Sequence, residues 1–476
     1  MPIITRKIEL CIDREGITDD EYKTHWQFLR QIDDNLYLVA NRISSHYFWT
    51  DEFENRMRMQ MPEYYKASKD IRKLAKKKMS EEEKESFEQL KEQLERLEDV
   101  IRQKKEDFLC GTSVRTSIYR LVSEEYSNLI PTDILTNLLQ KIADSYKEAS
   151  QDIRKGNRTL SNYRKGMPVP FSFPKDKNPF IIRDEGENAD ILFKWFEKRC
   201  GICFKMCFGK DRSNNREIVK RLIADFNKND GYKLNNSSIQ LVNKNGKTKI
   251  FLLLSLTIPV QKRTLDKELV LGVDLGIKYP LYLATNGTAY IKRYIGDSDS
   301  FLNERLVFQR RYKELQRNLQ CTTGGKGRGK KLQALELLRD KERNWVKTKN
   351  HVFSREVIKF ALKIGAGTIH LEKLTGIGRD NDGGVCDDRK FILRNWSYFE
   401  LQTMIKYKAK MEGIEVRFVS PAYTSQICCN CGERGERKEQ AVFRCMNPEC
   451  SEYGKEINAD YNAARNIALS KDVVAD

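Results

Sequence analysis

With 476 residues, the chain is long enough for two to four domains that each bury a core of their own. Lys and Arg total 86 against 68 Asp and Glu, so the net charge is +18, which favours nucleic acid as a partner over a basic surface that serves only solubility. No run of about 18 apolar residues occurs and the first residues lack the apolar core of a secretory signal, which excludes a membrane span and predicts a cytoplasmic protein.

The first third of the chain is predicted to be one strand, at residues 3–13, followed by a helical region. Three sets of apolar residues recur at steps of three and four, which places each set on one face of a helix and predicts ordinary core packing. The sets are Leu29, Ile32, Leu36, Val39 and Ile43; Phe87, Leu90, Leu94, Leu97 and Ile101; and Leu135, Leu138, Ile142 and Tyr146. Ser80 and Glu83 form a capping box before the second helix. That helix is charged on its other faces, so it pairs with a partner helix or lies in solvent.

From about residue 151 the chain changes to short β-rich runs. Pro168, Pro170 and Pro174 break helices, and two apolar runs flank Asn245-Gly246, which is a strong hairpin signal. We expect a small β-barrel or sandwich here. Residues 266–476 return to a mixed α/β pattern, with strands expected near 269–275, 281–291, 368–372 and 415–419.

A basic helical insertion interrupts the α/β region. Between Arg305 and Lys349 there are 14 Lys and Arg against 4 Asp and Glu. The stretch GGKGRGKK at 324–331 is similar to a P-loop, but Lys331 stands where Ser or Thr should hold Mg²⁺, and no strand precedes it. A basic loop beside a phosphate backbone therefore fits better than an ATPase site.

Four cysteines near the C-terminus have the spacing of a zinc ribbon. They are Cys428-x2-Cys431, then 13 residues, then Cys445-x4-Cys450. Two short pairs of thiolates suit a tetrahedral zinc ion, and four thiolates leave no open position, so the zinc is expected to be structural. The second pair is two residues longer than usual, and Cys429 is an alternate ligand beside the favoured Cys428.

A second cysteine cluster, Cys200-x2-Cys203-x3-Cys207, lies in an apolar run with strand character and has no fourth ligand nearby. We expect these three cysteines to be buried core thiols.

Three acidic residues stand where local structure changes. Asp274 ends an apolar strand in LVLGVDLG, Glu372 ends another in GTIHLEKL, and Asp460 opens a helix in INADYNAARNIA, where Asn458 can cap it. Any one of them alone is more often a solvated surface group. On three separate elements they can converge to hold two Mg²⁺ ions, one activating water and the other stabilising the leaving oxygen. The order Asp, Glu, zinc ribbon, Asp favours a metal-dependent nuclease with an RNase H-like fold.

The motifs GVDLG, HLEKL, TSQICCNCG and NADYNAARNIA are similar to the C-terminal half of transposon-encoded TnpB and of the compact type V CRISPR nucleases. The resemblance covers about 266–470, and the order of the earlier segments resembles the recognition lobe and wedge domain of miniature type V-F effectors. It implies that Asp274, Glu372 and Asp460 are the catalytic, Mg²⁺-binding acids. It also implies that the four spaced cysteines bind zinc in a target-strand-loading element. Two departures stand out: the long second knuckle, and Ala459 where TnpB proteins often carry Arg, which favours the CRISPR relatives slightly.

The fold that this resemblance implies is a multidomain α/β protein, with an RNase H-like RuvC domain into which the zinc ribbon is inserted. The expected segments are residues 1–20 as the first strand of the wedge domain, 21–150 as a helical recognition lobe, 151–265 as the β-rich wedge, 266–424 as the RuvC domain with its basic insertion near 300–350, 425–455 as the ribbon, and 456–476 as the RuvC C-terminal segment.

The expected function is RNA-guided cleavage of double-stranded DNA in CRISPR immunity. A TnpB-type guided nuclease and a guided DNA-binding protein with weak cleavage remain alternatives. None of the four histidines belongs to an HExxH pattern and no HNH-like module occurs, so one RuvC site must cut both strands in turn. A helical lobe of about 130 residues is small for a heteroduplex of about 20 base pairs. By resemblance we therefore expect a homodimer on one guide RNA, with the stripe Leu29–Ile43 or its neighbours at the contact.

Overall fold

The computed structural model describes residues 1–75, 81–175, 177–183, 186, 189–195, 201–211, 213–244, 247–261, 263–276, 279–321, 325–373, 398–421, 424–439 and 441–474. The chain divides into two compact units, Ile4–Thr257 on the one hand and Met1–Ile3 with Ile258–Asp476 on the other. Among the described helices, none is both long enough and apolar enough to cross a membrane.

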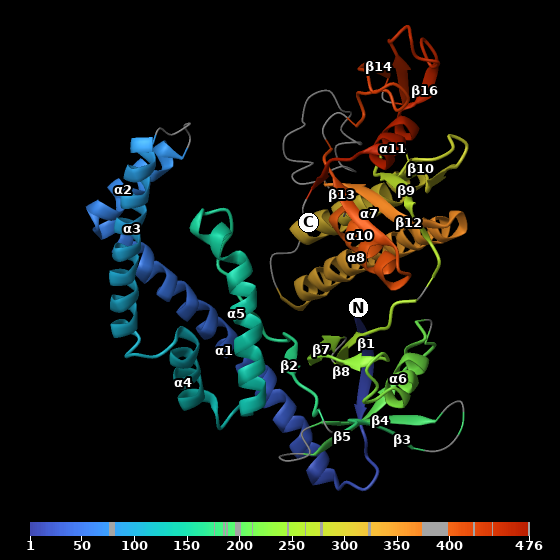
Figure 1. Cartoon of the computed structure of the whole chain (residues 1–476). Coiled ribbons are helices and arrows are strands. Elements are labelled where there is room, and N and C mark those ends of the chain that lie inside the picture. The colour runs from blue at the N-terminus through green and yellow to red at the C-terminus, as the bar shows by residue number, and fades with distance from the viewer. Residues whose placement is uncertain are drawn as a thin grey trace. The chain divides into compact units, whose positions relative to one another are not determined.

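The first unit contains five consecutive helices (Figure 1). They are α1 (Asp19–Gln60), α2 (Pro62–Leu74), α3 (Glu81–Phe108), α4 (Val114–Tyr126) and α5 (Thr132–Arg154). α1 begins with a capping box, because the Thr18 side chain accepts the N–H of Glu21 and the Glu21 carboxylate accepts the N–H of Thr18. The box expected at Ser80 falls on a residue outside those described.

The first and third apolar stripes form the core of this helical region, as predicted. All five residues of the first stripe, on α1, are at most 1% exposed, and the third stripe is buried on α5, which packs against α1. The second stripe is mostly half-buried on α3, which pairs with α2 and so has the expected partner helix. Since the first stripe is buried inside one chain, the expectation that it forms a contact between two chains is wrong.

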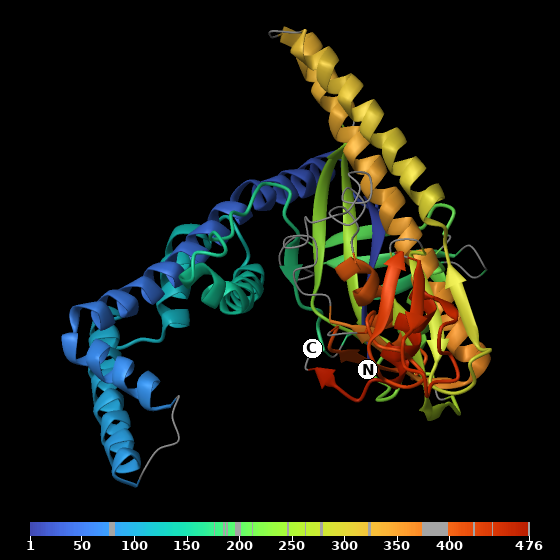
Figure 2. The same cartoon turned by 90° about the horizontal axis from the view of Figure 1, so that it is seen from above.

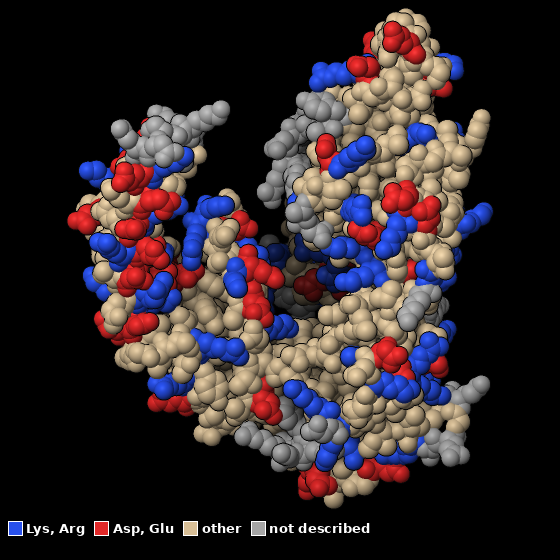
Figure 3. Space-filling view, in the orientation of Figure 1, with Lys and Arg blue, Asp and Glu red and all other residues tan. Residues whose placement is uncertain are grey.

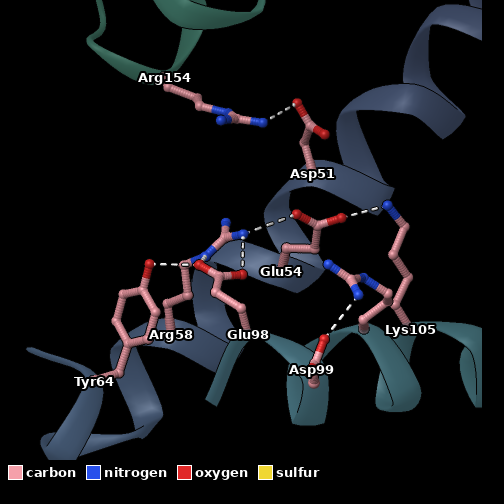
Figure 4. A network of polar contacts seen from close by, with 9 residues as sticks. Asp51, Glu54, Arg58, Tyr64, Glu98, Asp99, Lys105 and Arg154 are labelled. Atoms are coloured by element: carbon pink, nitrogen blue, oxygen red, sulfur yellow. Dashed lines mark hydrogen bonds and ion pairs between the residues drawn. The ribbon is translucent and has the colours of Figure 1, made fainter. Parts of the chain in front are cut away.

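A network of polar side chains ties α1, α2 and α3 together (Figure 4). The Arg58 guanidinium donates to both oxygens of Glu98, at 3.1 and 3.0 Å, and the Tyr64 hydroxyl donates to Glu98 at 2.6 Å. Glu54 accepts from Arg58 and from Lys105. The Glu98 side chain is 29% exposed, so these charge-assisted bonds are partly shielded from solvent. Elsewhere on the face of these helices shown in Figure 3, acidic and basic side chains alternate.

The β-rich part of the first unit is one eight-stranded sheet. Its order is β2 (Val169–Phe171), β7 (Ser237–Lys244), β8 (Lys247–Thr257), β1 (Ile3–Ile12), β5 (Ile202–Cys207), β4 (Asp190–Trp195) and β3 (Phe180–Arg183). The short strand β6 (Lys233–Leu234) pairs with β8, and helix α6 (Asn215–Ala224) lies between β5 and β6 in the chain. β7 and β8 pair as the predicted hairpin, although Asn245 and Gly246 lie outside the described residues. Of the two architectures expected here, a small β-barrel or a sandwich, the sandwich is wrong, because β1 joins β8 to β5 and places the described strands in one sheet.

The cysteines of β5 are not core thiols, contrary to the prediction. Ile202, Phe204 and Met206 are buried, so strand alternation turns Cys203 and Cys207 to the outer face, where both are half-buried. The Cys207 Sγ lies 3.2 Å from the Sγ of Cys11 on β1. Cys200, the third cysteine of that cluster, lies outside the described residues.

The second unit is built on a mixed six-stranded sheet, in agreement with the mixed α/β pattern expected for this region. Its order is β11 (Lys292–Ile295), β10 (Leu281–Thr285), β9 (Asp266–Asp274), β12 (Ala366–Glu372), β13 (Glu415–Val419) and β17 (Val473–Val474). β9, β12 and β13 are parallel and the other pairs are antiparallel. The strand expected at 281–291 ends earlier, at Thr285, because the Asn286 amide binds the backbone of β9 at Glu268 and Val270 and the chain turns back there into β11.

Helices cover this sheet and extend from it. α10 (Tyr398–Met411) packs against α8 (Gly325–Ile364) and β13, while α11 (Ala459–Leu469) packs against β9 and β10. The basic insertion is a long antiparallel hairpin of α7 (Ser298–Gln320) and α8, which projects well beyond the sheet (Figure 2). The ribbon is a separate three-stranded sheet of β14 (Gly435–Glu439), β15 (Val442–Cys445) and β16 (Glu456–Asn458), and β16 leads directly into α11.

Candidate active site and cysteine cluster

Two of the three predicted acids lie side by side at one edge of the sheet. Asp274 is the last residue of β9 and Glu372 the last of β12, and the parallel register pairs Val273 with Leu371. The three residues before each acid are buried, as is usual for parallel strands covered on both faces. The carboxyl ends of parallel strands are where open α/β sheets place their ligand sites.

The third acid is brought to the same place by α11. The Asn458 side chain caps this helix by accepting the N–H of Tyr461 at 2.9 Å, as predicted, and Asp460 lies in the first turn at 7% exposure. α11 comes very close to β9, because a Cβ added to Gly272 would lie 2.1 Å from the carbonyl oxygen of Ala464. Gly272 is therefore required for this approach.

Gly276 marks the point where two of the carboxylates meet. A Cβ on this residue would lie 3.6 Å from Oδ2 of Asp274 and 3.5 Å from Cγ of Asp460. It would also lie 2.9 Å from the carbonyl oxygen of Tyr279. The missing side chain thus leaves room between two acids that come from elements 186 residues apart in the chain (460 − 274).

The surroundings of Asp274 and Glu372 raise their proton affinity. Burial raises the pKa of Asp274 well above its ordinary value, and the charges of Glu372 and Asp460 raise it further, while Arg437 of β14 opposes them. Burial also raises the pKa of Glu372, against a hydrogen bond from Thr424. Crowded carboxylates that resist being charged together are typical of sites that bind a cation or exchange protons.

Sequence patterns did not single out the side chains around these acids. The Thr424 hydroxyl donates to Oε1 of Glu372 at 2.5 Å, and Tyr398, at the start of α10, has its pKa raised by burial and by the charge of Asp274. Asn462 and Asn466 bind the loop that begins at Thr424. The only sequence signal for these two was their spacing of four inside NADYNAARN, which puts them on one helix face.

The four spaced cysteines form one cluster. The Sγ atoms of Cys428, Cys431, Cys445 and Cys450 all lie within 4.8 Å of one another, and three of the four residues are buried. Gly432 takes a left-handed φ of 76° after the first pair, as the tight turn of a knuckle requires. This geometry fits a tetrahedral metal ion held by sulfur.

Two features of this motif depart from the usual pattern: the additional cysteine, Cys429, and the longer second pair. Cys429 is outside the cluster, and its backbone N–H donates to Oδ1 of Asn462 at 2.9 Å. The longer second knuckle closes through a turn in which Cys450 donates its N–H to the carbonyl of Asn447 at 3.1 Å. Hydrogen bonds, the largest from the N–H of Glu452, lower the pKa of Cys450 to about 7, which favours its thiolate form.

Comparison with known proteins gives consistent matches. Residues 398–467 match a family model described as "Cas12f1-like, TNB domain". The CRISPR-associated endodeoxyribonuclease Cas12f1 of Sulfoacidibacillus thermotolerans is 31% identical over 366 residues, which are 75% of this chain and 79% of the relative. Cas12f1 of Syntrophomonas palmitatica is 28% identical over 401 residues, covering 76% and 78%. The protein in a cryo-EM structure of a Cas12f1–sgRNA–target DNA complex shares the fold, with a TM-score of 0.61 at 20% identity over 99% of this chain and 100% of that chain.

Proposed function

Since the chain belongs to the Cas12f1 family of CRISPR-associated endodeoxyribonucleases, we propose that it is an RNA-guided nuclease that cuts DNA at Asp274, Glu372 and Asp460. The observation that carries the proposal is the meeting of these acids at two adjacent strand ends and one helix start. The similarity to Cas12f1 extends over three quarters of the chain, which favours a CRISPR effector over a TnpB-type nuclease.

The carboxylate site fits Mg²⁺. Oxygen ligands suit this ion, and a cation would relieve the repulsion that raises the pKa of Asp274. When bound, Mg²⁺ would supply an activated water and stabilise the leaving oxygen of a phosphodiester. Asp274, Glu372 and Asp460 would hold it. Thr424 donates to Oε1 of Glu372, so Oε2 would remain available to the ion, and the positive charge of Arg437 would favour a phosphate nearby.

The cysteine cluster fits a structural zinc ion, because four thiolates would complete its coordination. We assign the ribbon, residues 425–455, to contact with the target strand. We propose the following division for the other segments: residues 21–150 as a recognition lobe, 1–20 with 151–265 as a wedge domain, 266–424 and 456–476 as the nuclease domain. The basic α7–α8 hairpin would face nucleic-acid backbone. We place the protein in the prokaryotic cytoplasm, where guide RNA, DNA and reduced thiols occur together.

We further propose that two copies act on one guide RNA. The helices α1–α5 are few for enclosing a heteroduplex of about 20 base pairs. Because the first stripe is buried, we assign the contact between the two copies to exposed apolar residues near it on α1 and α2. They are Trp49 at 65%, Met59 at 83% and Tyr65 at 68% exposure. Light scattering of the guide complex should give two proteins per RNA, and one protein per RNA would contradict this assembly.

A cleavage assay beside a gel shift tests the nuclease proposal. Asp274→Ala should lose at least about 10³-fold in guided cleavage, because the acids act as one unit. DNA binding should persist, since it depends on base pairing and backbone contacts. Activity should need Mg²⁺ or Mn²⁺ and stop with a chelator. Normal cutting by Asp274→Ala would refute the site, and loss of binding together with cutting would show that Asp274 only supports the fold.

A further inference from the structure

Two buried asparagines connect the catalytic helix to the ribbon. Asn462 and Asn466 lie one turn apart on α11, at 0% and 7% exposure. Asn462 donates from Nδ2 to the carbonyl of Ile427 at 2.7 Å and accepts the N–H of Cys429 at 2.9 Å. Asn466 donates from Nδ2 to the carbonyls of Thr424 and Ile427, each at 2.8 Å. Both amides therefore bind one short stretch of backbone, 424–429.

That stretch touches both metal-binding centres. At one end, the Thr424 hydroxyl donates to Oε1 of Glu372. At the other, Cys428 belongs to the thiol cluster. It lies between Ile427 and Cys429, the two residues whose backbone is hydrogen-bonded to Asn462. α11 itself carries Asp460 two residues before Asn462. A displacement of Cys428 and its neighbours would therefore move Asp460 through the hydrogen bonds of Asn462. It would move Glu372 through the loop and the hydrogen bond of Thr424.

Packing alone does not require these amides. The rest of the buried face of α11 is mostly alanine, and an apolar side chain at 462 or 466 would avoid burying a polar group. A buried amide is tolerated only when its donors and acceptors are satisfied. This requirement favours one position of the loop over all others. The amide orientation of Asn462 is fixed by its partners, since exchanging O and N would set oxygen against the Ile427 carbonyl.

We propose that Asn462, Asn466 and Thr424 are positioning residues that lock the zinc ribbon to Asp460 and Glu372, so that order in the ribbon sets the geometry of the catalytic carboxylates. The inference rests on the proposed nuclease site. It adds to the ribbon's expected contact with the target strand a second role, which is to hold the carboxylates at the spacing that a divalent cation needs.

The test measures Mn²⁺ binding to the full-length, zinc-loaded chain by electron paramagnetic resonance, with Asp274→Ala as the background. Asn462→Ala and Asn466→Ala should each weaken the Asp274-dependent binding about 10-fold to 100-fold, as the loss of residues that orient metal ligands generally does. Both variants should still carry one zinc and still bind guided DNA. Thr424→Val should behave in the same way, and Thr424→Ser, which keeps the hydroxyl, should restore the affinity.

Asn41→Ala is the matched control. Asn41 makes the same kind of clasp between helix α1 and a loop, donating to the Tyr163 carbonyl at 2.9 Å and accepting its N–H at 2.7 Å, but it lies in the other unit. This variant should lose stability without losing Mn²⁺ affinity. An equal loss of Mn²⁺ affinity in Asn41→Ala would show general loosening and overturn the inference.

Combining variants tests the connection to the ribbon directly. Cys445→Ser, which breaks the thiol cluster, should weaken Mn²⁺ binding, and adding Asn462→Ala should weaken it little further, because both changes cut the same connection. Effects that multiply, or wild-type Mn²⁺ affinity in the asparagine variants, would refute the coupling while leaving the nuclease proposal intact. Wild-type binding no stronger than that of Asp274→Ala would instead refute the carboxylate site itself, and the coupling with it.

Discussion

Asp274 and Glu372 end adjacent parallel strands at the same level, because Val273 and Leu371 pair in the register between β9 and β12. This places two carboxylates next to each other at an edge of the sheet, where burial raises the pKa of both and the charges of Glu372 and Asp460 raise the pKa of Asp274 further. Charged carboxylates at the proposed site therefore lower the stability of the folded protein, and a bound cation would offset this by balancing their charge.

Asp274→Asn should stabilise the metal-free protein at neutral pH by about 1 kcal/mol. The pKa of Asp274 is raised on folding, so the folded state holds the proton more tightly, and the charged form is destabilising once the pH exceeds the unfolded value of about 4. The gain should therefore be absent below about pH 4 and grow as the pH rises toward the folded pKa. Thermal unfolding across pH measures this, with Mg²⁺ expected to stabilise the wild type but not the variant. A destabilised variant at neutral pH would contradict the pKa direction.

Gly276→Ala should reduce guided cleavage by about 10²-fold, because an added methyl group would lie 2.9 Å from the Tyr279 carbonyl oxygen and force the backbone beside Asp274 and Asp460 to move. Gly287→Ala is the control, since its Cβ would make only an ordinary contact with Leu269 at 3.7 Å. Cleavage rates at saturating Mg²⁺ compare the two variants. Equal rates in Gly276→Ala and the wild type would mean that the space beside Asp274 and Asp460 is not used.

Purified protein should carry about one zinc per chain, bound by thiolates. Cys445→Ser should lose the metal and much of the cleavage activity while keeping most guide binding. Cys429→Ser should keep the zinc, because Cys429 stands outside the cluster. Elemental analysis of freshly prepared proteins decides both points, and a wild type without zinc would refute the assignment.

Glu98→Gln should destabilise the packing of α1, α2 and α3 by about 1 to 3 kcal/mol, since it leaves Arg58 and Tyr64 without their charged partner. The Arg58 hydrogen bond lowers the pKa of Glu98, so this stabilisation is present above about pH 4 and is lost as the pH falls through the folded pKa. Glu92→Gln on the same helix should change little, because its pair with Arg96 is 3.9 Å long and exposed. Thermal unfolding that shifted equally in both variants would argue against the network.

The sequence predicted the elements whose signals are local. The stripe on α1, the hairpin of β7 and β8, the acids at strand ends and the Asn458 cap each depend on residues close together in the chain. The cysteine spacing predicted the cluster for the same reason. The capping box of Thr18 and Glu21 is also local, and the sequence carries a T-x-x-E signal for it.

Other features could not be predicted because their partners are distant. Thr424 lies 52 residues from Glu372, and Asn466 lies 42 residues from Thr424, so neither contact has a local pattern. The outward placement of Cys207 depends on strand register, which a short apolar run does not reveal. The position of β1 between β8 and β5 could not be predicted either, because β1 is far from both strands in the chain.

The division of the carboxylates among distant segments also governs when the centre can form during synthesis. β9 pairs with β12 only after the whole α7–α8 hairpin has been made, and α11 follows the ribbon. Ribosomes extend a chain at about 5–20 residues per second, and pairings so far apart in sequence form slowly. A nascent chain that ends before α11 therefore has Asp274 and Glu372 but lacks Asp460. It lacks one of the three acids proposed for catalysis, however much of its earlier structure has already folded.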